Sequence, residues 1–330
     1  MKVRYIAGRE SSSVDVLGID ISKADFHGCL IQGSAFAKHS FPNTPAGYQQ
    51  VRKWLGNRGC TAVHVCMEAT GAYWEGLATA LFEAGLQVSV VNPSRTVHFA
   101  RSQLRRTKTD SVDAEMIAQF CQTQRPAHWS PPTEEIRELR ALLTYRDQLV
   151  DDRLRLKQMA NQIHLNQALQ EVHDRQIDAL NESVKAVEQQ LRAVVKAHQR
   201  LNEQVRRLSA VDGIGFLTAT TLIAKLPVER LRDGKAAAAY VGLTPRERQS
   251  GTSINGKPRI CKTGNASLRS NLYMPAVVAS GRNAILKEFS ERLIARGKHK
   301  KVAIVAVMRK LVVLAFSILK ETPTATLAHA

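Results

Sequence analysis

The chain has 330 residues, of which 44% are hydrophobic, so it is long enough for two or three domains with real cores. It carries 47 Lys and Arg against 29 Asp and Glu, a formal net charge of +18 that is spread along the sequence. Such an excess favours a polyanionic partner, nucleic acid first and an anionic membrane second.

Two function classes are disfavoured by the same composition. The five cysteines form no CxxC pair, which argues against a disulfide framework and against a zinc site. The most apolar stretch, 302–319, is interrupted by Arg309 and Lys310, which favours a packed helix over a membrane span. We therefore expect a protein of a reducing, soluble compartment.

The first part of the chain predicts a mixed α/β domain over residues 14–130, after a flexible N-terminus at 1–13. Short apolar runs predict strands at 14–20, 26–31, 35–41, 62–67 and 86–91. Helical periodicity predicts helices at 45–55, 72–84 and 113–122. Three strands in succession followed by alternating helix and strand are typical of a mixed sheet.

A long helical arm is predicted over residues 131–207. The segment from Thr133 to Asp212 contains no Gly or Pro, and its second half repeats apolar residues at heptad spacing. The polar residues 171–176 are the predicted reversal. The pattern fits an antiparallel hairpin and an intersubunit coiled coil equally, so both stay open.

The C-terminal domain, predicted over residues 208–320, is mainly α-helical, and a flexible tail follows at 321–330. Its Gly213-Ile214-Gly215 turn resembles a helix–hairpin–helix element, whose backbone N–H groups can meet a phosphate, although a plain helix corner has the same pattern. Residues 246–263 read as an irregular basic loop. Helices are predicted at 264–280, 284–296 and 302–320.

Four acids stand at positions where side chains converge in an α/β domain. Asp110 and Asp113 are three residues apart, so they project from one face of the helix that they begin. Asp20 and Glu68 each end a predicted strand. Carboxylates brought together repel one another unless cations lie between them, and two Mg²⁺ or Mn²⁺ ions would form a phosphodiester-cleaving site. The alternative is that the two aspartates only favour the helix N-terminus.

The order of several motifs resembles a known family. In the first half these are Gly18-Ile19-Asp20-Ile21-Ser22-Lys23, Glu68-Ala69-Thr70-Gly71, Asn92-Pro93 and Lys108-Thr109-Asp110-Ser111-Val112-Asp113-Ala114. In the second half they are Asp212-Gly213-Ile214-Gly215, Ala239-Tyr240-Val241-Gly242-Leu243-Thr244-Pro245, Gln249-Ser250-Gly251, Lys262-Thr263-Gly264-Asn265 and Leu268-Arg269. Together they resemble the DEDD transposases of bacterial insertion sequences, the recombinases directed by a bridge RNA.

The resemblance implies a fold and a mechanism beyond what the spacing shows. The N-terminal domain would be RuvC-like, of the RNase H fold, with Asp20, Glu68, Asp110 and Asp113 as catalytic metal ligands. Ser250 would attack DNA and form a covalent 5′-phosphoserine intermediate. The arm would be a coiled coil joining protomers into a dimer, and two dimers would form a tetramer on donor and target DNA with an element-encoded guide RNA. The expected location is the bacterial cytoplasm, at the nucleoid.

Basic residues near these motifs are the expected phosphate contacts. They are Arg105, Arg106, Lys108, Arg246, Arg259, Lys262, Arg269, Lys298, Lys300 and Lys301. Two other functions stay open on the sequence. One is a junction or structure-specific endonuclease that uses the four acids and water, with Ser250 structural. The other is a catalytically dead scaffold that binds nucleic acid.

Overall fold

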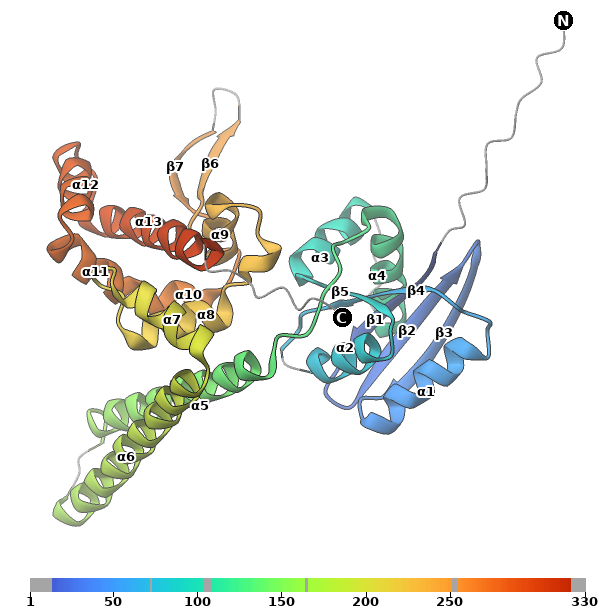
Figure 1. The fold of residues 1–330 in the computed structure, drawn as a ribbon, viewed down its shortest axis with the longest axis horizontal. Coiled ribbons are helices and arrows are strands. Elements are labelled where there is room, and N and C mark those ends of the chain that lie inside the picture. Colours follow the sequence, from blue (N-terminus) through green and yellow to red (C-terminus); the bar gives the residue numbers. More distant parts are fainter. Residues whose placement is uncertain (1–13, 72, 104–108, 164–165, 251–253, 322–330) are drawn as a thin grey trace, which may run out of the picture. The chain divides into compact units, whose positions relative to one another are not determined.

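The computed structural model describes residues 14–71, 73–103, 109–163, 166–250 and 254–321, with the backbone alone at 247–250 and 254–258. It divides into two compact units, Met1–Pro132 and Thr133–Ala330 (Figure 1).

The first unit contains a five-stranded sheet in the order β3-β2-β1-β4-β5. Its strands are β1 (Asp15–Ile21), β2 (Asp25–Gln32), β3 (Ala35–Pro42), β4 (Val63–Glu68) and β5 (Gln87–Val91). β1, β2 and β3 are an antiparallel meander, whereas β4 runs parallel to β1, and β5 runs parallel to β4. The predicted mixed α/β sheet is therefore confirmed.

Three helices cover the two faces of this sheet: α1 (Pro45–Gly56), α2 (Trp74–Glu83) and α4 (Asp110–Gln124), while α3 (Pro93–Ser102) packs against α4 (Figure 1). α1 and α2 pack on one face, where Leu17 and Ile19 of β1 lie in the core. α4 packs on the other face, against Val16 and the buried thiols Cys29 and Cys66, and it adds the thiol of its own Cys121. Because side chains alternate along a strand, even-numbered residues of β1 face α4 and odd-numbered residues face α1 and α2.

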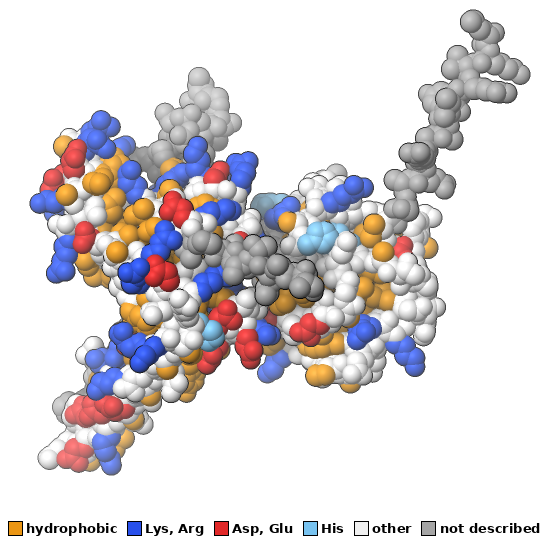
Figure 2. All heavy atoms as spheres, in the orientation of Figure 1, with side chains coloured by type: hydrophobic (Ala, Val, Ile, Leu, Met, Phe, Trp, Pro, Cys, Tyr) orange, Lys and Arg blue, Asp and Glu red, His pale blue; other side chains and the backbone are white. Residues whose placement is uncertain are grey.

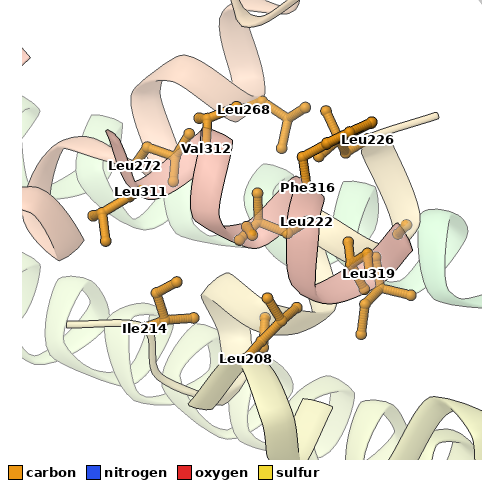
Figure 3. Packing of buried hydrophobic residues seen from close by; sticks show 14 of the residues in the cluster. Leu208, Ile214, Leu222, Leu226, Leu268, Leu272, Leu311, Val312, Phe316 and Leu319 are labelled. Atoms are coloured by element: carbon orange, nitrogen blue, oxygen red, sulfur yellow. The ribbon is translucent and has the colours of Figure 1, made fainter. Parts of the chain in front are cut away.

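The second unit is mostly helical, as predicted. Its elements are α5 (Glu134–Ala160), α6 (Gln167–Ala197), α7 (Gln199–Ser209), α8 (Phe216–Lys225), η1 (Val228–Arg230), α9 (Gly234–Val241), β6 (Pro245–Ser250), β7 (Ile254–Ile260), α10 (Ala266–Asn271), α11 (Tyr273–Arg282), α12 (Ala284–Ala295) and α13 (Lys300–Glu321). Figure 3 shows part of their common core, in which Leu208 and Ile214 from the α7–α8 corner pack with Leu311 and other residues of α13.

The arm is a hairpin formed by α5 and α6 of one chain. Leu149 packs against Val184 and Val187, and the Arg146 Nε donates to the Glu188 carboxylate at 2.8 Å. The reversal predicted at 171–176 is wrong, because α5 ends at Ala160 and α6 begins at Gln167, capped by the side chain of Asn166. The polar run that suggested a turn is instead part of α6, exposed except at the buried His173.

Two further expectations for this unit were wrong. Residues 246–263 contain the antiparallel strands β6 and β7 in place of an irregular loop. A two-stranded ribbon outside a larger sheet does not need the apolar alternation by which strands are recognised. The single helix expected at 264–280 is divided at Leu272 into α10 and α11.

The last helix, α13, is long and apolar enough to cross a membrane on length and composition alone. In the structure it supplies Val307, Leu311, Ala315 and other residues to the core of the second unit. The prediction of a packed helix is therefore confirmed.

Candidate active site

Asp20 and Glu68 lie at the same edge of the sheet and on the same face. β1 and β4 are parallel and paired up to Ile19 and Met67, so Asp20 and Glu68 are the next residues of the two strands. Asp20 lies an even number of residues from Val16, and Glu68 lies two residues from Cys66, so both side chains are on the sheet face that α4 covers. Each is partly buried. The strand pattern alone thus brings two of the four acids together.

Gly18 lets α4 approach this edge closely. A Cβ atom at Gly18 would stand 2.2 Å from the Ala118 nitrogen and 2.3 Å from the Ala114 carbonyl oxygen. Only a residue without a side chain fits beneath a helix backbone at that distance. α4 therefore lies directly on β1, and its first turn, which carries Asp110 and Asp113, lies near Asp20.

The cap of α4 is provided by a residue other than the two aspartates. Thr109 has extended backbone angles, and its hydroxyl accepts from the Val112 N–H at 3.4 Å. Asp110 and Asp113 still benefit from the positive end of the helix dipole. Since Thr109 already meets the capping need, helix capping does not by itself account for both acids.

The charges at this edge act on one another. Burial raises the pKa of Asp20, and the nearby Asp113 and Asp110 carboxylates raise it further, while His27 opposes the shift. His27 pairs with Asp20 across β1 and β2, and its Nε2 lies 3.7 Å from Asp110 Oδ2. The aspartates therefore form one electrostatic group, and a cation between them would relieve the repulsion.

Glu68 is held from the other side by α3. The Thr96 hydroxyl hydrogen-bonds to Glu68 Oε1, and Thr96 is almost completely buried. Neither Thr96 nor His27 was among the predicted site residues. The sequence does carry a signal for α3, because Asn92-Pro93 is an N-cap residue followed by a proline at the first helical position.

Oxygen donors of this kind suit Mg²⁺ or Mn²⁺ rather than a softer metal. Within the described part of the chain, no group of three or more His, Cys, Asp or Glu side chains is gathered as tightly as a bound ion requires. Burial and then the Asp113 and Asp110 carboxylates raise the pKa of Asp20, so three of the four acids lie close enough to act on one another. The four acids fit a divalent cation in donor type and charge.

Ser250 belongs to the second unit, where it ends β6 and pairs with Ile254. Its side chain lies outside the described residues, as do Arg105, Arg106 and Lys108. Arg269 donates to the carbonyl oxygens of Val241 and Lys262, so its guanidinium holds the chain around Gly242. The remaining candidate contacts with described side chains are exposed: Arg246, Arg259, Lys262, Lys298, Lys300 and Lys301. Figure 2 shows Lys and Arg side chains distributed over the helices of this unit.

Comparison with known proteins places the whole chain among transposases and related proteins. Residues 17–173 match the model of the IS110-type DEDD transposases, and residues 205–291 match that of the IS116/IS110/IS902 transposase family. The pilin gene-inverting protein of Moraxella bovis is 32% identical over 92% of this chain and 95% of its own length. The IS1111A transposase of Coxiella burnetii is 25% identical over 80% of this chain and 77% of its own. The IS1328 transposase of Yersinia enterocolitica is 27% identical over 81% of this chain and 84% of its own length.

The protein is thus an enzyme of the DNA transposase and recombinase class. More narrowly, the chain belongs to the IS110/IS116 family of transposases.

Proposed function

We propose that this protein is an RNA-guided, site-specific DNA recombinase that excises and inserts its own insertion element. The observation that carries the proposal is the group of acids formed where α4 crosses β1 at Gly18, in which the Asp113 and Asp110 carboxylates act electrostatically on Asp20. The sheet order, with an antiparallel meander followed by two parallel strands, supports the RNase H-like, RuvC-like fold that is part of this proposal.

In this proposal Asp20, Glu68, Asp110 and Asp113 would hold Mg²⁺, which would stabilise the charge that develops on the phosphate. The Ser250 hydroxyl attacks the phosphorus of the scissile phosphodiester. A bond forms between Oγ and phosphorus, the bond to the 3′-oxygen breaks, and a 3′-hydroxyl leaves with a proton. The 5′-phosphate stays on the serine until a DNA hydroxyl reverses the step.

The test of the nucleophile is the covalent adduct. Wild-type protein incubated with Mg²⁺, guide RNA and a suicide DNA substrate should give a DNA–protein band on a denaturing gel. Ser250→Ala should give none, whereas the matched control Ser253→Ala should retain it. An adduct with Ser250→Ala would refute the serine assignment.

The same gel distinguishes the other two functions. Nicked DNA without any adduct in the wild type would support an endonuclease that uses the acids and water. Binding that EDTA leaves unchanged, with no cleavage under any condition, would support a dead scaffold. Sequencing of RNA that copurifies with the protein tests RNA guidance, which requires one discrete RNA from the DNA flanking the gene.

Assembly into a dimer and then a tetramer is part of the proposal. The outer part of the arm exposes Leu154, Met159, Leu169 and Val172, apolar side chains that a second copy could cover. Replacing Leu154 and Leu169 by Glu should convert the dimer to a monomer in light scattering. The matched control, Glu at Gln158 and Gln170, leaves the apolar surface in place. A wild type that is monomeric at micromolar concentration with RNA and DNA would contradict this part.

A second candidate function is inversion of a DNA segment between two sites. It is favoured by the near full-length similarity to pilin gene-inverting proteins of two Moraxella species, at 32% identity. A plasmid carrying the two recombination sites in opposite orientation tests it, with PCR across the new junctions. Inverted plasmid without excised circles would favour inversion, and excised circles from the intact element would favour transposition.

A further inference from the structure

Helix α3 begins where the strands of the acid site end. The Ala69 N–H, directly after Glu68, donates to the Val91 carbonyl at 2.9 Å. Asn92 then caps α3, since its Oδ1 accepts from the Ser94 N–H at 2.8 Å. These two hydrogen bonds fix the start of α3 next to the ends of β4 and β5.

Within that first turn, Thr96 directs a buried hydroxyl at Glu68. The residue is 4% exposed, and its Oγ1 lies in hydrogen-bonding distance of Glu68 Oε1 and 2.8 Å from the Pro93 carbonyl oxygen. A hydroxyl has one proton, and a hydrogen bond to an ionised carboxylate is about twice as strong as one to a neutral carbonyl. The proton therefore goes mainly to Glu68.

The same helix also contacts the element that carries the other acids. The Phe99 ring meets the Phe120 ring of α4 edge-on, with centroids 5.6 Å apart. The Arg95 guanidinium lies 5.1 Å from the centre of the same ring. α3 thus contacts both Glu68 and α4, and Thr96 makes a polar contact with one of the four acids.

We propose that Thr96 is a positioning residue that orients the Glu68 carboxylate toward the divalent cation. This inference rests on the proposed function, because it takes the four acids to be a metal site. A hydroxyl that fixes one oxygen of the Glu68 carboxylate limits the rotation of that side chain before a metal ion binds. Less side-chain conformational entropy is then lost on binding, which favours a higher affinity.

Binding of Mn²⁺ to the full-length protein, followed by electron paramagnetic resonance without DNA, tests the role directly. Thr96→Val keeps the shape and removes the hydroxyl, and it should weaken Mn²⁺ binding about 10-fold or more, the range for partners of metal ligands. Thr96→Ser restores the hydroxyl and should bind within about 3-fold of the wild type on the same scale. Equal affinity of Thr96→Val and wild type would overturn the proposal.

A double variant shows whether Thr96 acts through Glu68. In a Glu68→Ala background, Thr96→Val should change Mn²⁺ affinity less than about 2-fold, because non-additivity is the sign of coupled residues. An undiminished effect there would also overturn the proposal. If Thr96→Val lacks a cooperative thermal transition, Thr96→Cys replaces it, and its weaker donor of similar size should lower Mn²⁺ affinity in the same direction.

Mn²⁺ binding by the wild type and by the Thr96 variants separates the metal site from the role of Thr96. A wild-type protein that binds no Mn²⁺ contradicts the proposed metal site, and the role of Thr96 with it. A wild type that binds Mn²⁺ while Thr96→Val binds equally well contradicts the role of Thr96 alone. Equal losses in the valine and serine variants, with unchanged thermal stability, would assign the effect to packing and refute the hydroxyl.

Discussion

The contact between Gly18 and α4 makes a quantitative prediction. A methyl group at position 18 would stand 2.2 Å from the Ala118 nitrogen, and ordinary van der Waals contact begins at 3.4 Å, so α4 must move by about 1.2 Å. The obstructing atoms belong to backbone and cannot rotate away. Gly18→Ala should therefore lose about 3 kcal/mol of stability, at the upper end of the usual cost of overpacking.

Guanidinium-induced unfolding measured with Mg²⁺ chelated checks this value. The matched control is Gly28→Ala on the next strand, where the added methyl would meet a Leu17 side-chain atom at 3.3 Å and no backbone atom closer than 3.8 Å. That variant should lose less than about 1 kcal/mol. Displacement of the first turn of α4 by about 1 Å should also lower DNA cleavage about 100-fold. A Gly18→Ala protein as stable as Gly28→Ala would refute the close packing of α4 on β1.

Three further predictions concern the same unit. Asp20→Asn should raise the thermal midpoint of the metal-free protein at neutral pH, because burial and the two other aspartates raise the pKa of Asp20. A carboxyl whose pKa is raised by folding stabilises the folded protein at pH values below its unfolded pKa, and this stability is lost as the pH rises through its folded pKa. The gain in thermal midpoint from Asp20→Asn should therefore shrink toward pH 4, and a gain that does not change with pH would contradict the prediction. Lys38→Met removes the 2.7 Å ion pair with Glu115 and should cost about 1 kcal/mol or less in denaturant unfolding, because Lys38 is partly exposed and Gln119 still donates to the Glu115 carboxylate. Ser89→Ala removes a fully buried hydroxyl that hydrogen-bonds to the His64 imidazole and to two backbone carbonyls, and it should lower the free energy of unfolding by about 1–3 kcal/mol. The control Ser34→Ala, at an exposed position, should leave the stability unchanged.

Alternation along the strands made part of this site predictable. Asp20 and Glu68 end apolar runs, and the parallel pairing of β1 with β4 follows from the helix between them. His27 could not be found in this way. It lies inside a strand, and it becomes a neighbour of Asp20 only through the register of β1 with β2. That register depends on the geometry of the loop between the two strands, which the sequence did not define.

Thr96 was missed for a different reason. The predicted strand ended at residue 91 and no helix was predicted after it, although Asn92 followed by Pro93 is also a pattern that begins a helix. Without α3, nothing directed attention to a threonine four residues further on. Ser250 is the opposite case, because its assignment came from the resemblance alone, and no property of a serine in a hairpin distinguishes a nucleophile from a turn residue.

The buried thiols between α4 and the sheet can report how often this helix separates from the sheet. Cys29, Cys66 and Cys121 are fully buried between the sheet and α4, and burial raises the pKa of Cys29 to about 11. A thiol reagent can reach them only when the helix leaves the sheet, so their rate of modification reports the frequency of that opening. A divalent cation that joins the aspartates of α4 to the strand ends should slow the modification of all three.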